Sequence, residues 1–127
     1  EEELLDYARI DLCIVGGLTE ARKIAGWCET HYIKIAPHNP LGPVSAAACL
    51  HLDLATDNFG VQEMWHGRTD FLADLFPVQI PFESGHLLPP GRPGLGIEFN
   101  ESAAANYPYQ QQSGARLVRS DGSLTNW

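Results

Sequence analysis

The order of apolar runs along the chain most constrains its fold. Short runs rich in β-branched and aromatic residues, at residues 7–15, 33–36 and 59–62, alternate with two segments of helical spacing. The helices are expected from Thr19 to about residue 31, and from the end of the loop at residues 38–43 to about residue 54. A β-α-β-α-β order with short linkers and nearly continuous apolar strands is typical of parallel strands covered by helices. The pattern predicts an α/β fold, either half of a (β/α)-barrel or one wing of an open sheet.

Local signals predict where the first strand ends and the first helix begins. Gly16 and Gly17 interrupt the first apolar run, so we expect the strand to continue as far as Val15. Thr19 follows the two glycines, and a threonine hydroxyl can accept a backbone N–H at a helix start. The expected helix therefore begins behind a cap from Thr19.

The length of the chain limits the barrel interpretation. The chain has 127 residues, whereas a complete eight-stranded barrel needs roughly 250 residues. Its single methionine is Met64, not the first residue, so we expect a piece of a longer polypeptide. An opened barrel would also expose unpaired strand edges, which invite aggregation. We therefore expect another chain, or another stretch of this one, to complete the barrel.

The sequence changes character after Glu63. Residues 79–88 alternate around a Ser-Gly pair and predict a hairpin, and residues 100–106 predict one or two helical turns. A polar tail with little periodicity follows. We therefore divide the chain into a partial barrel domain at residues 1–76 and a C-terminal tail at residues 77–127. The tail is expected to pack on a capping domain or on a neighbouring subunit.

The charge of the chain excludes some classes of partner. The formal net charge of −8 argues against nucleic acid and against an anionic membrane surface. No apolar run is long enough to span a bilayer. The three cysteines, Cys13, Cys28 and Cys49, are odd in number and form no CxxC pair. We expect them to be buried, reduced thiols of a cytoplasmic protein, with a zinc site as the alternative.

His38 is the first candidate for chemistry. It follows the apolar run at residues 33–36 after a single proline, and prolines restrict the backbone on both sides of it. Active sites of (β/α)-barrels lie at the carboxyl ends of the strands, and an imidazole exchanges a proton near neutral pH. The alternative is that His38 is a structural or merely exposed histidine.

Two acidic residues are expected beside His38. Asp11 lies about one βα unit before it, and Glu63 lies one βα unit after it. One βαβ unit returns the chain to the same end of the neighbouring strand, so the three side chains would share one rim. A carboxylate beside an imidazole fixes its tautomer and raises its pKa. The alternatives are that Asp11 caps a turn or pairs with Arg9 or Arg22, and that Glu63 forms an ordinary salt bridge.

The remaining histidines are weaker candidates. His66 follows Glu63 closely and could reach the same rim. His31 is expected at a helix C-terminus, where a cation is favoured by the helix dipole. His51 is expected to pack on a helix face, and His86 to lie in the hairpin. The chain contains no dinucleotide fingerprint, P-loop, HExxH or serine nucleophile elbow.

Three motifs carry a resemblance to a known family. DLCIVGGLTE at residues 11–20, APHNPLGP at 36–43 and NFGVQE at 58–63 resemble the mandelate racemase subgroup of the enolase superfamily. Within it, they are most similar to sugar-acid dehydratases of the galactonate dehydratase kind. The ending, with PGLG at 93–96 and DGSLTNW at 121–127, is more similar to mannonate dehydratases. The resemblance covers nearly the whole chain, but only the C-terminal part of the family's chain.

The resemblance implies a fold and a set of site residues. The fold is the C-terminal part of a modified (β/α) TIM barrel, its last three strands, with an extended C-terminal tail. Asp11 and His38 match a catalytic dyad of the sixth and seventh strands, and Glu63 matches a glutamate that ends the eighth. Asn39 stands where some relatives carry Cys or Gly, so it is expected with Glu63 and His66 among the substrate-binding residues. The Mg²⁺ of the family is held by three carboxylates on earlier strands, outside this chain.

The resemblance also implies an activity. A family member of this kind removes the proton α to a sugar-acid carboxylate and expels the β-hydroxyl, giving a 2-keto-3-deoxy acid. In enolase-superfamily sites Mg²⁺ stabilises the charge that develops, and the histidine matching His38 is the expected general acid. Alternatives are a mannonate or gluconate dehydratase, a racemase or epimerase of the same superfamily, or a non-catalytic truncated remnant. The chain alone is expected to be inactive without the capping domain and the first barrel strands, and the completed protein to be a homo-oligomer.

Overall fold

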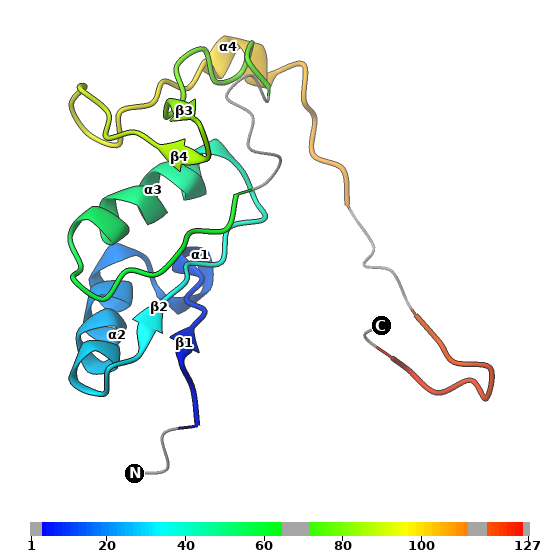
Figure 1. The fold of residues 1–127 in the computed structure, drawn as a ribbon. Coiled ribbons are helices and arrows are strands. Elements are labelled where there is room, and N and C mark those ends of the chain that lie inside the picture. Colours follow the sequence, from blue (N-terminus) through cyan, green and yellow to red (C-terminus); the bar gives the residue numbers. More distant parts are fainter. Residues whose placement is uncertain (1–3, 65–71, 112–116, 126–127) are drawn as a thin grey trace.

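A computed structural model describes residues 4–64, 72–111 and 117–125. The first half of the chain contains two βα units and a third extended segment (Figure 1). Its elements are β1 (Tyr7–Ala8), α1 (Leu12–Val15), α2 (Leu18–Thr30), β2 (Lys34–Ile35) and α3 (Pro43–Leu54). β1 and β2 are parallel, with Tyr7 opposite Lys34. A parallel bridge joins Ile35 to Phe59. The predicted α/β order with parallel strands is confirmed.

Parallel pairing continues beyond the two-residue strands. The backbone N–H of Ala36 donates to the carbonyl of Ala8 at 2.9 Å, and that of His38 donates to Ile10 at 2.8 Å. These bonds extend the parallel pairing beyond the carboxyl ends of β1 and β2, as far as Ile10 and His38. The same hydrogen bonds therefore fix the backbone of His38 against the chain that leads into α1.

The third segment, residues 59–63, pairs with β2 through an irregular ladder. The N–H of Gly60 donates to Ile35 at 2.9 Å, and the N–H of Glu63 donates to Pro37 at 3.2 Å. A regular parallel ladder advances two residues on each strand, so the second donor would be Gln62. The third segment thus contains one extra residue, a bulge. This bulge interrupts the pairing, so the segment forms a single bridge at Phe59 in place of the strand expected at residues 59–62.

The predicted first strand is wrong beyond its first half. Asp11 begins α1, because its Oδ1 accepts the N–H of Cys13 at 2.8 Å and caps the helix. The helix ends at Gly16, whose φ of +106° is the left-handed conformation that glycine adopts readily. The predicted cap at Thr19 is also wrong, since α2 begins at Leu18 behind Gly17 and has no side-chain cap.

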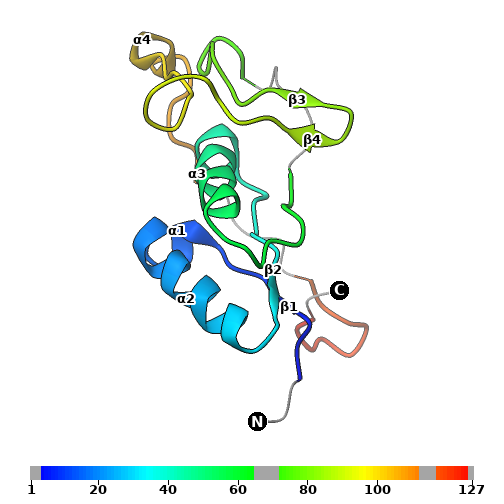
Figure 2. The same ribbon diagram turned by 60° about the vertical axis from the view of Figure 1, so that its left-hand side comes forward.

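Helices α2 and α3 lie on one side of the parallel strands, as the outer layer of a barrel does (Figure 2). The core lies between these helices and the strands. Its buried members are Ile10, Leu12, Ala21, Ala25, Cys28, Ile35, Cys49 and Leu52. Within the described residues no helix covers the opposite face of the strands, where half of the Tyr7 side chain is exposed. This one-sided packing is that of a barrel segment.

The predicted hairpin at residues 79–88 is confirmed as β3 (Phe82–Glu83) and β4 (His86–Leu87). Ser84 and Gly85 both have positive φ, as a two-residue hairpin turn requires. The hairpin lies against α3 (Figure 1), where Ile80 packs on Ala47 and Leu50. A one-turn helix α4 (Glu101–Ala104) follows, as expected. The division of the chain at residue 76 stays a prediction.

The cysteines differ from the expectation at one position. Cys28 and Cys49 are buried free thiols, and burial raises the pKa of Cys49 to about 12. Cys13 is exposed, because the segment that holds it is a helix whose Leu12, not Cys13, faces the core. In the described part of the chain, no helix has the length and apolar character needed to cross a bilayer.

Candidate active site

Three ionisable side chains meet at the carboxyl ends of the parallel segments. Asp11 follows β1, His38 follows β2 and Glu63 ends the third segment. The backbone ladder described above holds these positions at one rim. The structure therefore brings together the three residues that the βα spacing placed there.

Asp11 and His38 form a close pair. Nδ1 of His38 lies 2.7 Å from Oδ2 of Asp11, which is only 9% exposed. The other carboxylate oxygen caps α1 through the N–H of Cys13. The hydrogen bond from His38 is the main cause that lowers the pKa of Asp11, and the Cys13 N–H adds to it. Asp11 is thus both a helix cap and a partner of His38. The expected pair with His38 and the alternative that Asp11 caps a turn are therefore compatible.

The pairing determines which imidazole nitrogen is available. An ionised Asp11 accepts the proton on Nδ1, which leaves Nε2 of His38 to gain or lose a proton. Nε2 lies 3.7 Å from Oε2 of Glu63, and the His38 side chain is 33% exposed. A partly open imidazole with a fixed orientation is suited to proton transfer.

Glu63 is held by two further groups. Nη2 of Arg9 lies 2.7 Å from both carboxylate oxygens, and the N–H of Asn39 donates to Oε2 at 3.0 Å. Arg9 is the main cause that lowers the pKa of Glu63. The sequence suggested Arg9 only as a partner of Asp11. Its position two residues before Asp11 on an extended chain is a signal that it shares the same face.

The other two predicted substrate-binding residues stand differently. Asn39 is only 1% exposed, and its side-chain nitrogen donates to the sulfur of Met64 at 3.7 Å. Its described contribution to the rim is therefore the backbone N–H that binds Glu63. His66 lies outside the described residues.

The described residues do not fit a Mg²⁺ or zinc site. Among them, no group of three or more His, Cys, Asp or Glu side chains is arranged to hold a metal ion. Asp11 and Glu63 are the carboxylates at the rim, and His38 and Arg9 already occupy their oxygens.

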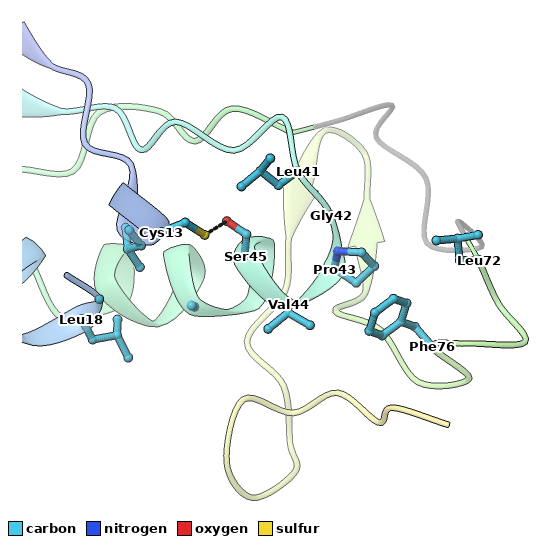
Figure 3. Close-up of a pocket in the computed structure, with 12 residues that line it drawn as sticks. Cys13, Leu18, Leu41, Gly42, Pro43, Val44, Ser45, Leu72 and Phe76 are labelled. Atoms are coloured by element: carbon cyan, nitrogen blue, oxygen red, sulfur yellow. Dashed lines mark hydrogen bonds between the residues drawn. The ribbon is translucent and has the colours of Figure 1, made fainter. Parts of the chain in front are cut away.

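A cavity of about 550 Å³ is lined by residues of α1, of the start of α3 and of the loop after His38 (Figure 3). Leu41, Pro43 and Val44 contribute to its wall from the loop after His38 and from the start of α3. A contact of 3.8 Å between Cys13 Sγ and Ser45 Oγ lies on its border. The walls of this cavity are mainly apolar, so the titratable groups of this region lie at the Asp11–His38–Glu63 rim.

Comparison with known proteins gives the family. Residues 1–103 match the family described as "Enolase C-terminal domain-like". The chain belongs to this family. In the enolase C-terminal domain the chain supplies the last three strands of a modified TIM barrel, and its relatives are of the galactonate and mannonate dehydratase kind.

Two relatives illustrate the match. A D-galactonate dehydratase family member of Streptomyces bingchenggensis is 38% identical over 128 residues, covering 99% of this chain and 31% of its own length. A D-mannonate dehydratase of Caulobacter vibrioides is 37% identical over 129 residues, covering 100% of this chain and 32% of its own. This enolase C-terminal chain therefore spans about a third of the length of the curated relatives it matches.

Solved structures agree with this assignment. An enolase from Pantoea ananatis with bound D-gluconate and Mg superposes with a TM-score of 0.79 at 37% identity, covering 87% of this chain and 27% of that one. A putative galactarate dehydratase from Agrobacterium radiobacter, bound to Na and L-malate, superposes with a TM-score of 0.83 at 31% identity. The match covers 94% of this chain and 34% of that one.

Proposed function

We propose that the complete protein to which this chain contributes is a sugar-acid dehydratase of the galactonate dehydratase kind. Its product is a 2-keto-3-deoxy acid. The relatives with dehydratase names support the reaction class. The observation that carries the proposal is the 2.7 Å pair between Asp11 and His38, which leaves Nε2 facing the rim.

His38 is the proposed general acid. In dehydration the Cα–H bond breaks, a base takes that proton, the Cβ–O bond breaks, and a C=C bond forms that tautomerises to the ketone. The leaving hydroxyl needs a proton to depart as water. Nε2 of a protonated His38 supplies it, while the carboxylate of Asp11 stabilises the imidazolium and keeps its orientation. The base that takes the α-proton lies outside this chain.

Glu63 and Arg9 are proposed to organise the substrate side of the rim. Oε2 of Glu63 lies 3.7 Å from Nε2 of His38, so the carboxylate faces the nitrogen that transfers the proton. Arg9 holds both carboxylate oxygens, and so it acts as a positioning residue for Glu63. We propose that Glu63 accepts a hydrogen bond from a substrate hydroxyl, that the backbone N–H of Asn39 holds Glu63 in place, and that His66 completes the binding surface.

We propose that the ligands of a divalent cation lie on earlier strands of the barrel, because the described residues of this chain do not form such a site. Bound there, the cation would balance negative charge on the substrate carboxylate. The residues of this chain contribute proton transfer and substrate orientation. The same reasoning makes the chain inactive alone and dependent on the first barrel strands and a capping domain.

The test is the chemical nature of the product. The complete protein with Mg²⁺ is incubated with galactonate, mannonate and gluconate in separate reactions, and a carbonyl reagent detects keto acid. The proposal expects a keto acid from at least one of them. A changed stereocentre without a keto acid would indicate a racemase or epimerase, and no reaction with any sugar acid would favour a non-catalytic remnant.

A further inference from the structure

A buried carboxylate on α3 has no partner among the residues that the structure describes. Asp53 is 7% exposed, and no hydrogen-bond donor reaches either of its carboxylate oxygens. It lies in the last turn of α3, where the helix dipole disfavours a negative charge. Burial raises the pKa of Asp53 to about 7. A buried charge of this kind is tolerated when a cation or several donors compensate it.

The same residue lines a cavity of about 650 Å³. The lining residues come from α3, from the third segment and from the β3–β4 hairpin, which lies beside α3 in Figure 2. Its apolar wall includes Phe59, Val61, Met64 and Leu87. Gln62 also lines it, and its Oε1 is buried without a donor. The cavity thus combines an apolar wall with three orphaned oxygens.

The orphaned atoms define the chemistry of the missing group. Both oxygens of Asp53 and Oε1 of Gln62 are acceptors, so a group with several N–H donors and a positive charge would satisfy them. A guanidinium offers five N–H donors in a planar fork, on an apolar stem that suits the wall. A lysine ammonium directs its donors from a single point and matches two separate side chains less well.

The position of the cavity identifies what brings this group. Within the described residues, the backbone of the third segment pairs only with β2 and the residues that follow it, so the segment is an edge of the opened barrel. In a closed eight-stranded barrel the last strand is followed by the first. The first βα unit of the completed barrel therefore lies along this edge. We infer that an arginine of that unit docks in this cavity and pairs with Asp53. The inference rests on the proposed function, because a complete barrel supplies that unit.

The test uses the complete protein and the variant Asp53→Asn, with Asp57→Asn as a matched control at an exposed aspartate nearby. Asparagine keeps the shape and removes the charge, which leaves the arginine buried and unpaired. We expect the Tm of Asp53→Asn to fall by about 5 °C or more, with faster hydrogen exchange at residues 59–64 and 82–88. The control is expected to stay within about 1 °C of the wild-type Tm.

An unchanged or raised Tm in Asp53→Asn would overturn the inference, because asparagine resembles the protonated, unpaired acid. If that variant does not assemble, the wild-type protein provides the answer by ¹³C NMR of its aspartate carboxyls. A paired Asp53 stays ionised at pH 5, and an unpaired one titrates near pH 7. These readouts do not depend on turnover. A complete protein without dehydratase activity that still loses stability in Asp53→Asn would retain the docking site and reject the proposed function.

Discussion

Arg9 and Glu63 form an ion pair that spans β2 and joins the first and third segments of the sheet. Nη2 of Arg9 lies 2.7 Å from each carboxylate oxygen of Glu63. The two residues are 54 positions apart, so the pair ties the start of the described sheet to its end. It also fixes the carboxylate that faces Nε2 of His38.

Replacing Arg9 with methionine removes this tie and keeps much of the apolar stem. Because Arg9 is the main cause that lowers the pKa of Glu63, that pKa is expected to rise toward its ordinary value near 4.5. ¹³C NMR titration of the Glu63 carboxyl in the complete protein measures the change. Arg22→Met, at an exposed position on α2, is the control and should leave the titration unchanged. A Glu63 pKa that does not rise in Arg9→Met would contradict the assigned pair.

The two roles of Asp11 can be separated by two substitutions. Asp11→Asn still offers an oxygen to cap α1, but its amide cannot accept the Nδ1 proton in the same way. We expect Asp11→Asn to keep the cap on α1 while kcat falls about 10³-fold. Asp11→Ala removes the cap as well and is expected to cost about 1 kcal/mol more in unfolding free energy. Equal kcat in the Asn variant and the wild type would show that the pair has no part in the reaction.

The stability of the complete protein should depend on Asp11 in acid. The pKa of Asp11 is lowered from its ordinary 3.8, so the unfolded state binds a proton first as the pH falls. Its contribution is present above about pH 4 and is lost as the pH falls through the folded value. Urea unfolding of wild type and Asp11→Asn is therefore expected to differ at pH 6 and to converge near pH 2. A difference that grows as the pH falls would contradict the sign.

Gly60 is required by the ring of Tyr7. A Cβ at Gly60 would lie 2.7 Å from Cε1 of Tyr7 and 3.2 Å from the carbonyl of Ile35. We expect Gly60→Ala to destabilise the complete protein by about 1–3 kcal/mol, because β1 and the third segment cannot both keep their places. Gly26→Ala is the control, since nothing lies within 4 Å of its added Cβ, and it should stabilise α2 by about 1 kcal/mol. Equal effects of the two substitutions would contradict the close approach.

The rim could be predicted because it depends on local rules. Asp11, His38 and Glu63 each follow an apolar run, and successive βα units return to one end of a sheet. The two glycines and the prolines around His38 marked real boundaries, although α2 starts at Leu18, two residues earlier than a cap at Thr19 implied. The Ser84-Gly85 pair identified the hairpin for the same reason, since its positive φ values are a local requirement.

Other features depend on contacts that no local pattern encodes. Ile14 and Val15 favour a strand by composition, yet the cap from Asp11 places them in α1. The extra residue before Glu63 appears only when the ladder with β2 is traced. The partner of Arg9 is Glu63 rather than Asp11, because the third segment brings Glu63 to the same face. The unpartnered Asp53 looks like an ordinary helix residue until its burial is known.

The rate of keto-acid formation by the complete protein and its His38→Asn variant tests the central claim most directly. His86→Asn, in the hairpin away from the rim, serves as the control. We predict that Mg²⁺ still binds His38→Asn while kcat falls at least about 10²-fold, and that His86→Asn retains wild-type turnover. Wild-type turnover by His38→Asn would contradict the assignment of His38 as the general acid.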